Sequence, residues 1–535
     1  MMSHDRNHDD AQGPRGFFSR EAMSGVPWVV ISKLLLFIIY FGVSVLTVNG
    51  LGREQFGIYS LILNISSYML IICGLGLGAA LMRYIPELAA RKNRWALGHL
   101  LWKSAALQLA AVTGVSLLLL LLDEPLQRLF KAEQVEYFSF YLKLACGLTA
   151  LLLIKDFVAT VFTSVFKTRT VAILSVAQGL LWFVVLFAAL DIRPAVDTVF
   201  FVQMFSVAAV YLFGAVVLVR HIRALPWENR EFGIGKRRTL SFSGTVMLNS
   251  ILRTVMFKYS EVFFIAAVGG TTLAGIYDLG YSLPYTAVTF IPLSLLALFT
   301  SAFAEAYTRD RDCLGLLISS YYKLLMMVSL PIAVLGFFFS PEVYHIIYRG
   351  EMDEAGYLAA VFCLVLCLPL FSMPLSAAIK AREKVWSMVP MLLIQIMVNL
   401  MLDWVLIVHL KLGVWGGIGA VVGTFVLTIP LRVFVVRQIL GGIYFPARFF
   451  LRVFATLVVE AAVFHWVTDK TRIFERVDGQ WTGVVLLVLL GTLYLGVFLL
   501  LVRFNRVVRE EDIADFHALE IKRLNKMLRF MVRQG

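Results

Sequence analysis

The residues most able to do chemistry in this sequence are charged side chains that lie within long apolar stretches. They are Lys33, Lys155, Asp156, Arg253, Lys258, Glu261, Asp278 and Asp403. A charged residue at the centre of a bilayer costs about 2.5–3.5 kcal/mol on insertion scales, so it usually faces a cavity or a partner. These side chains are therefore the candidates for binding a charged substrate or a coupling ion.

The basic members of this set predict a cationic wall that would suit an anion crossing the membrane. Lys33 lies in the first apolar stretch, and Arg253 lies near the middle of the seventh. An arginine can hold phosphate oxygens through two parallel hydrogen bonds. The candidate substrate-binding residues are Lys33, Arg253, Lys258 and Lys155.

The acidic members are the candidates for ion coupling, and ion pairing is the competing interpretation. Lys258 and Glu261 are three residues apart, so they can pair on one helix face. Lys155 and Asp156 point about 100° apart around a helix, so we expect them to have separate partners. The candidates for the coupling acid are Asp156, Glu261, Asp278 and Asp403.

A polar stripe on the eleventh apolar stretch also has two interpretations. Gln395, Asn399 and Asp403 follow one another at intervals of four residues, so they share one face of a helix. The stripe is either a hydrogen-bonded packing seam or part of a cation-coupling site. We favour the seam.

Motifs for catalysis, metal binding and nucleotide binding are not visible. The eight histidines form no HExxH-like pattern, and the five cysteines show no extramembrane spacing pattern. Gly74-x-Gly76-x-Gly78 resembles the start of a dinucleotide fingerprint, but it ends an apolar stretch that no strand precedes. Close helix packing through Gly74-x3-Gly78 and Gly419-x3-Gly423 is the preferred interpretation. We expect no catalytic residue, no metal site and no cofactor.

The composition places the charged residues in a membrane. Of 535 residues, 60% are hydrophobic and 16% are charged, and the mean hydropathy is +0.82, whereas soluble proteins carry about 25% charged residues. The net charge of +13 could suggest nucleic acid, but the basic residues cluster in alternate loops, as topology signals do. The composition predicts a polytopic membrane protein that binds no nucleic acid.

About twenty apolar residues cross a bilayer as a helix, and on that measure the chain has about fourteen spans. They are 27–48, 56–79, 98–122, 138–164, 170–190, 197–219, 241–267, 274–302, 313–338, 355–379, 386–407, 414–436, 450–468 and 481–502. With the N-terminus inside, roughly thirty basic residues lie inside and roughly nine outside, which makes both termini cytoplasmic. No loop exceeds about 22 residues, which leaves no room for an extramembrane catalytic domain.

A repeat relates the two halves of the chain. The motif G-x4-G-I-Y begins at Gly52 and again at Gly270, 218 residues later. Other pairs at this offset are Ser32 and Ser250, Glu87 and Glu305, and Arg91 and Arg309. Spans 1–6 therefore match spans 7–12 as parallel repeats, related by an axis along the membrane normal, and we expect the function to lie between them.

The sequence predicts an all-α polytopic membrane protein of two six-helix repeats with two further helices. The predicted segments are a cytoplasmic N-terminal tail (1–26), an N-lobe (27–219), a basic cytoplasmic linker (220–240), a C-lobe (241–437), helices 13 and 14 (438–502) and a basic amphipathic cytoplasmic tail (503–535).

Three stretches carry a resemblance to a known family. They are LGREQFGIYSLILNISSYMLIICGLGLGAALMRYIPE (51–87), FKTRTVAILSVAQGLLWFVVLF (166–187) and AGIYDLGYSLPYTAVTFIPLSLLALFTSAFAEAY (274–307). They resemble the bacterial polysaccharide flippases, the O-antigen and exopolysaccharide exporters of the multidrug/oligosaccharidyl-lipid/polysaccharide superfamily. The fourteen spans are also similar to the lipid II flippase branch.

The resemblance implies V-shaped packing of two lobes around a cationic cavity, with basic residues on the first helix of each lobe, where Lys33, Arg253 and Lys258 lie. It implies translocation of undecaprenyl-pyrophosphate-linked oligosaccharide from the inner to the outer leaflet of the bacterial inner membrane by alternating access. The implied partners are this lipid-linked substrate, membrane lipids, and the polysaccharide polymerase and glycosyltransferases of the same pathway.

Two alternatives stay open. A multidrug exporter of the same superfamily would carry cargo that is often cationic, so carboxylates should dominate its cavity. A non-transporting scaffold or a scramblase of a glycan assembly complex is a different class of function.

Overall fold

The computed structural model is helical and contains no strand within the residues it describes. These residues are 15–90, 93–131, 137–165, 167–224, 244, 247, 248, 251, 252, 260–309, 313–370, 372–381, 385–442, 444–474, 479–505, 507 and 508. Long apolar segments fold as helices because a helix satisfies its own backbone N–H and C=O groups, which hydrocarbon cannot do.

Ten helical stretches of the described chain are long and apolar enough to cross a membrane, so this is a multi-pass membrane protein. One of them, Ile31–Gly74, covers the first two predicted spans, because helix α1 is interrupted only at Gly52, where φ is 70°. The predicted eighth and thirteenth spans lie in helices of 39 and 25 residues, α10 and α17, which are not among the ten.

The chain divides into two compact units. Unit 1 comprises Met1–Leu51 and Ile62–Ile251, and unit 2 comprises Gly52–Leu61 and Leu252–Gly535. Residues 52–61 of α1 therefore belong to unit 2. The predicted linker from 225 onward and the predicted amphipathic tail from 509 onward lie outside the described residues.

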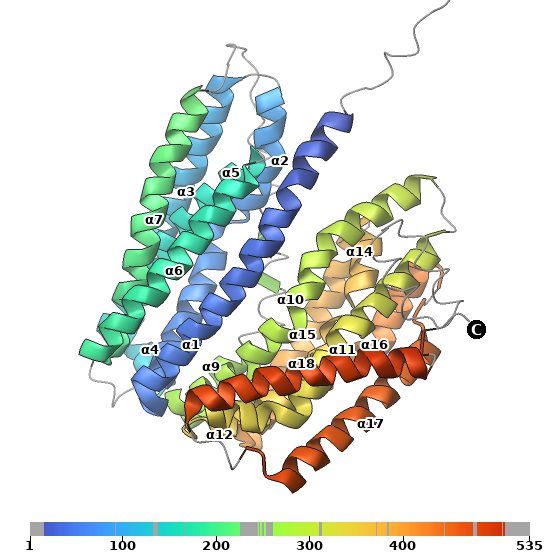
Figure 1. The fold of residues 1–535 in the computed structure, drawn as a ribbon. Coiled ribbons are helices and arrows are strands. Elements are labelled where there is room, and N and C mark those ends of the chain that lie inside the picture. The colour runs from blue at the N-terminus through green and yellow to red at the C-terminus, as the bar shows by residue number, and fades with distance from the viewer. Residues whose placement is uncertain are drawn as a thin grey trace, which may run out of the picture. The chain divides into compact units, whose positions relative to one another are not determined.

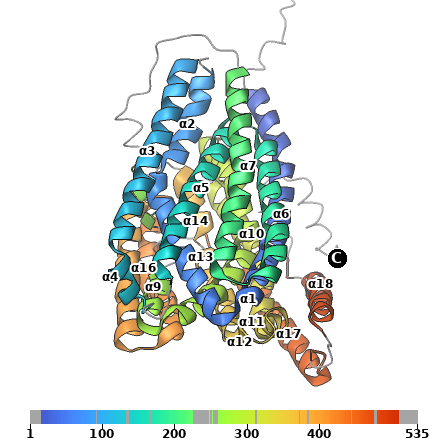
Figure 2. The same ribbon diagram turned by 90° about the vertical axis from the view of Figure 1, so that its left-hand side faces the viewer.

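Unit 1 is a bundle in which α5 contacts most of the other helices. Its helices are α1 (Arg15–Gly74, apart from 52–61), α2 (Leu77–Ala90), α3 (Arg94–Leu121), α4 (Asp123–Leu129), α5 (Phe138–Ser164), α6 (Thr168–Ile192) and α7 (Val196–Ala224). α5 packs against α2, α3 and α7, and α6 packs against α7. Figure 1 shows α3, α5, α6 and α7 running side by side, and Figure 2 shows the same bundle after a 90° turn.

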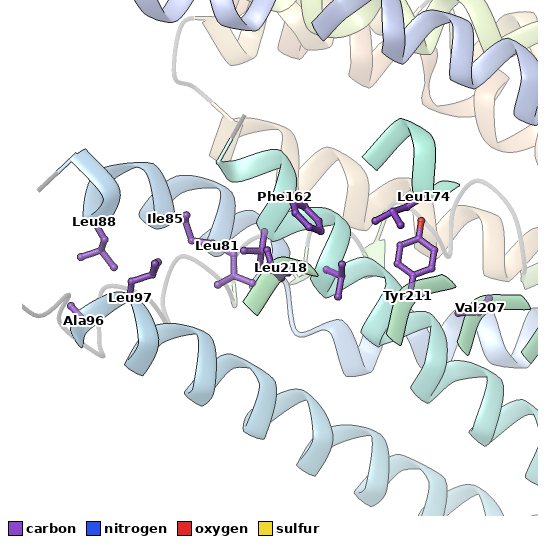
Figure 3. Packing of buried hydrophobic residues seen from close by; sticks show 12 residues of the cluster. Leu81, Ile85, Leu88, Ala96, Leu97, Phe162, Leu174, Val207, Tyr211 and Leu218 are labelled. Atoms are coloured by element: carbon purple, nitrogen blue, oxygen red, sulfur yellow. The ribbon is translucent and has the colours of Figure 1, made fainter. Parts of the chain in front are cut away.

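The core of unit 1 follows from the spacing of apolar residues on α2. Leu81, Ile85 and Leu88 recur at helical intervals and are at most 1% exposed. They pack in one cluster with Leu97 of α3 and Phe162 of α5 (Figure 3). This cluster joins the short helix α2 to the long helices of the bundle.

Unit 2 is built around α11. Its helices are α9 (Ser260–Gly269), α10 (Thr271–Arg309), α11 (Cys313–Ile347), α12 (Asp353–Val365), α13 (Cys367–Leu370), α14 (Met373–Ala381), a 3₁₀ turn (Val385–Met388), α15 (Val389–Asp403), a π-helix (Trp404–His409), α16 (Gly413–Leu440), α17 (Ala447–Thr471) and α18 (Gln480–Phe504). α11 packs against α10, α12, α17 and α18, while α15 and α16 pack together and contact α9.

The last two helices, drawn in red and orange in Figure 1, are additions to the repeat. α17 and α18 pack on each other as well as on α11. Val488, Leu489 and Leu493 of α18 are 55–62% exposed, and apolar side chains that face away from the protein in a membrane suit contact with lipid tails.

The two predicted glycine packing motifs have different outcomes. A Cβ at Gly423 would lie 2.9 Å from Leu402 of α15, so this glycine does permit close packing of α16 on α15. A Cβ at Gly74 would meet no atom within 4 Å, so the prediction of close packing there was wrong. Gly74 instead ends α1, and Leu75 and Gly76 turn the chain with positive φ.

Candidate functional site

The strongest candidate site is a pair of buried carboxylates in unit 2. Glu261, in the first turn of α9, is 2% exposed, and Asp403, the last residue of α15, is 0% exposed. These two helices are far apart in sequence and pack against each other. Burial of two acids in one region of a membrane helix bundle marks a functional site more often than a packing site.

Asn399 connects the two helices through hydrogen bonds. Its Nδ2 donates to Glu261 Oε1 at 3.2 Å, and its Oδ1 accepts from the Ser260 hydroxyl at 3.0 Å. Asn399 is 0% exposed and lies one helical turn before Asp403. The amide therefore holds the Glu261 carboxylate on the face of α15 that also carries Asp403.

Asp403 is the member of the cluster that lacks hydrogen-bond donors. Neither of its carboxylate oxygens has a hydrogen-bond partner within the described chain. The Ser260 hydroxyl lies near this carboxylate, but its single hydrogen is donated to Asn399. A buried carboxylate without donors requires a proton or a cation, because an isolated buried charge costs far more than a buried neutral group.

The backbone beside Asp403 is also unusual. The α-helical turns of α15 end at Asp403 and continue as the π-helix Trp404–His409, in which the N–H of Leu410 bonds to the carbonyl of Val405 at 2.8 Å. Short π segments are frequently found at functional sites. The π-helix packs against α9 and α16, so the irregular turn lies among the helices that form the cluster.

The polar stripe of α15 serves partly as a packing seam, as we favoured from the sequence. Gln395 Nε2 donates to the Thr428 hydroxyl of α16 at 3.0 Å, and Asn399 bonds to α9 as described above. Gln395 Oε1 and the buried hydroxyl of Tyr277 have no hydrogen-bond partner in the described residues. The seam therefore holds α15 to its neighbours, but the carboxylate oxygens of Asp403, like these two oxygens, accept no hydrogen bond from the described residues.

The repeated G-x4-G-I-Y motifs meet each other within unit 2. Gly52 and Gly270, which open the two motifs, both adopt positive φ, 70° and 85°. A Cβ at Gly275 would lie 2.6 Å from the Cα of Gly57, which is its equivalent in the repeat. Only glycine permits so close an approach of two backbones. Residues at the same position of the two repeats therefore contact each other directly.

Asp278 has a hydrogen-bond donor at this crossing. Ser60 Oγ donates to Asp278 Oδ2 at 2.8 Å, and the two residues are 218 apart, the offset of the repeat. Arg53 Nη2 forms an ion pair with Glu354 Oε2 at 2.7 Å in the same unit. Of the four candidate coupling acids, Asp278 and Glu261 therefore each accept a hydrogen bond from a side chain of another helix.

Lys155 of unit 1 also has a structural partner. Its Nζ donates to Gln178 Oε1 at 3.0 Å and lies 5.7 Å from the centre of the Tyr211 ring. Gln178 Nε2 in turn donates to the Ser206 hydroxyl at 3.3 Å, which joins α5, α6 and α7. The neighbouring Asp156 is exposed, and Lys155 bonds to Gln178 and not to it; that Asp156 has a partner of its own stays a prediction.

The remaining basic candidates are placed only in part. Lys33 is exposed on α1. Arg253 and Lys258 lie outside the described residues. The cationic wall and the pairing of Lys258 with Glu261 therefore stay predictions.

Glu460 is a buried acid that the sequence reasoning did not select. It is 5% exposed on α17, and neither of its carboxylate oxygens has a hydrogen-bond partner in the described chain. A lone glutamate within the apolar run 453–464 was the signal that could have identified it.

Comparison with known proteins identifies relatives of this chain. The family model described as "Polysaccharide biosynthesis protein" matches residues 22–303, which is more than half of the sequence. A search of curated protein sequences finds no match.

Solved structures share the fold at low sequence identity. The lipid II flippase MurJ, in an inward closed conformation, matches with a TM-score of 0.65 and 13% identity over 91% of this chain and 100% of MurJ. An inward-facing multidrug resistance MATE family transporter of the MOP superfamily matches with a TM-score of 0.61 and 18% identity over 75% of this chain and 94% of that one. A MOP superfamily transporter from Pyrococcus furiosus, described as having a binding pocket of reverse polarity, matches with a TM-score of 0.55 and 16% identity over 79% and 97% of the two chains.

Proposed function

Because the chain belongs to the polysaccharide biosynthesis protein family, we propose that it is a transporter of lipid-linked sugars rather than an enzyme. The proposed substrate is an oligosaccharide on undecaprenyl pyrophosphate, moved from the inner to the outer leaflet of the bacterial inner membrane by alternating access. The family match carries this proposal, and the fold shared with a lipid II flippase supports it.

The chemistry of such a substrate demands a polar path through the bilayer. A pyrophosphate group carried through hydrocarbon without partners would meet a prohibitive desolvation cost. Lys33, Arg253 and Lys258 are the residues that we propose to contact it. Lys155 is less suited to this role, because its ammonium group already bonds to Gln178.

We place the coupling ion at the cluster of Glu261, Asn399 and Asp403. Carboxylate and amide oxygens suit a hard cation, and a carboxylate can equally hold a proton. Two features favour Asp403 over Asp278 as the coupling acid. Asp403 is buried without a hydrogen-bond donor, whereas Asp278 accepts a hydrogen bond from Ser60.

Binding at this cluster can influence the packing of helices. Asn399 ties α15 to α9 through Ser260 and Glu261. A cation between the two carboxylates would draw α9 and α15 together, and its release would leave two buried charges that repel each other. The cluster could in this way favour different helix arrangements with and without the ion.

The experiment that tests the substrate proposal is surface polysaccharide production in a cell that depends on this chain. Lys33→Ala and Arg253→Ala should each abolish the surface polysaccharide while the protein remains inserted at normal levels. Lys103→Ala is the matched control, because Lys103 is an exposed lysine near the end of a predicted span and should export normally. Unchanged export in both test variants would contradict the proposal that Lys33 and Arg253 contact the substrate.

The coupling proposal has a separate readout in reconstituted vesicles. Asp403→Asn should abolish the dependence of lipid-linked sugar flux on an ion gradient, because a neutral amide neither releases a proton nor attracts a cation. Asp278→Asn should retain that dependence. If Asp403→Asn keeps the full gradient dependence, the coupling site lies elsewhere.

A multidrug exporter is the second candidate, since a MATE family transporter shares the fold. The same vesicles separate the two functions, because a drug exporter would move an organic cation and leave lipid-linked sugar in place. Equal flux of sugar lipid in both directions without a gradient would instead indicate a scramblase, and no flux of either cargo would favour a scaffold.

The proposed setting follows from the proposed substrate. We place the chain in the bacterial inner membrane with both termini in the cytoplasm, as the distribution of basic residues favours. The proposed partners are membrane lipids and the polymerase and glycosyltransferases of the same polysaccharide pathway.

A further inference from the structure

The appended helix α17 carries an acid at its centre. Glu460 is the fourteenth of the 25 residues in Ala447–Thr471. It is 5% exposed and shares its buried face with Val453, Leu457 and Ala461. This face packs against α11 and α18, so the carboxyl group lies among apolar helices and not at their ends.

Two polar side chains of α17 and α18 bear on the surroundings of this acid. The hydroxyl of Tyr494, on α18, is buried without a hydrogen-bond partner in the described chain, and it is close enough to Glu460 for the two groups to interact electrostatically. His465 lies five residues further along α17, with its ring 5.8 Å from those of Phe338 and Phe339 and its Nδ1 buried and unpartnered in the described chain.

No lysine or arginine of these three helices lies beside Glu460. α11 has no charged residue between Lys323 and Glu342, and α18 has none between its first residue and Arg503. On α17 the nearest lysine or arginine is Arg452, about two turns away, and its guanidinium lies over the ring of Phe449 toward the start of the helix. Arg448, Asp469 and Lys470 are further still, near the helix ends.

We propose that Glu460 is a proton-binding site, separate from the Glu261–Asp403 cluster, and that the packed arrangement of α11, α17 and α18 requires the proton to be bound. Among the described residues, a bare carboxylate at this position would have neither a lysine or arginine counter-ion nor a hydrogen-bond donor. The carboxylic acid is neutral, so its burial costs far less than that of a bare carboxylate. Loss of the proton would favour exposure of Glu460 to water, and therefore separation of α17 from its neighbours.

The first test is labelling of the purified full chain with a hydrophobic carbodiimide. The proton of a carboxylic acid passes to a carbodiimide nitrogen, the carboxylate oxygen adds to the central carbon, and an acyl shift leaves an N-acylurea that carries the whole reagent. We expect the peptide containing Glu460 to gain this mass at pH 6 and progressively less as the pH rises. Glu460→Gln should remove the adduct, and Asp469→Asn should not, because Asp469 is exposed.

The second test needs no reagent to reach the site. If the folded chain binds a proton that the unfolded chain has released, stability falls as the pH rises. Thermal unfolding of the wild type between pH 6 and pH 9 should therefore show a steeper fall of Tm with pH than that of Glu460→Gln. Asp403→Asn in the same series measures how much the Glu261–Asp403 cluster contributes to the fall of Tm with pH.

Either test can contradict the Glu460 proposal, and neither measures transport, so a failure here is distinct from a failure of the proposed function. Identical dependence of Tm on pH in the wild type and in Glu460→Gln would overturn the proposal. Labelling of Glu460 that does not vary with pH would also overturn it.

Discussion

The contact between Gly57 and its repeat equivalent offers the sharpest test of the structure. Gly57→Ala adds a single methyl group where α1 crosses α10. That Cβ would lie 2.5 Å from the backbone oxygen of Thr271 and 2.8 Å from the backbone carbon of Thr271 and the Cα of Thr272. All three atoms belong to the backbone, so no side-chain rotation can relieve the clash.

The size of the effect follows from these distances. Ordinary contact begins near 3.4 Å, so the helices must separate by about 0.9 Å, the difference between 3.4 and 2.5 Å. The 2.8 Å bond from Ser60 to Asp278 would then lengthen toward about 3.7 Å, which is too long for a hydrogen bond. An added methyl group in a packed site costs about 1–3 kcal/mol, which corresponds to about 5–150-fold in the population of the close crossing.

Disulfide formation between Ser60→Cys and Asp278→Cys measures how often the crossing is close. The five native cysteines are first replaced by alanine, so that only the introduced pair can react. We expect Gly57→Ala to slow oxidation of the pair at least fivefold, because disulfides tolerate little change in Cβ separation. Blocking of the remaining free thiols with a large maleimide makes the difference visible on a gel.

Gly114→Ala is the matched control for this experiment. Gly114 lies in α3, and a Cβ there would meet no atom within 4 Å. This variant should oxidise at the parent rate. If Gly57→Ala also oxidises at the parent rate, the close crossing of the two motifs is wrong.

Two other perturbations test the magnitudes of polar contacts. Gln178→Leu removes the acceptor of the Lys155 ammonium group and should lower the free energy of unfolding by about 1.5–3 kcal/mol, visible as a lower Tm in detergent; an unchanged Tm would show that Lys155 has another partner. Arg53→Ala breaks an ion pair with Glu354 whose side chains are 40% and 60% exposed, so solvent screening limits the loss to about 1 kcal/mol or less. A much larger fall in Tm would show that this surface pair is more important than its exposure suggests.

The sequence was sufficient for the features that depend on local composition and on self-similarity. Hydropathy identifies the helices because each span must be apolar over its own length, wherever the rest of the chain lies. The turn between α5 and α6 was also predicted from its basic residues, Lys167 and Arg169. The repeat was detected from identical residues at one offset, and the positive φ of both Gly52 and Gly270 is its structural counterpart.

The candidate sites needed the tertiary structure, because each depends on contacts between residues that are distant in sequence. Glu261 and Asn399 are 138 residues apart, and no periodicity of either segment reveals their hydrogen bond. The sequence placed Asp278 and Asp403 in the same class of intramembrane acid. One accepts a hydrogen bond from Ser60 and the other has no donor, so only the packing of neighbouring helices distinguishes them.

The burial of Glu460 was decided by the same kind of information. A glutamate in an apolar run can face lipid headgroups, water or a helix interface, and hydropathy is the same in each case. Packing of α17 on α11 and α18 selects the interface and removes the carboxyl group from solvent. The sequence by itself therefore predicted most of the apolar helices and the repeat of the two halves, whereas only the tertiary structure decided which charges are buried and which have partners, because burial and pairing are properties of contacts between segments.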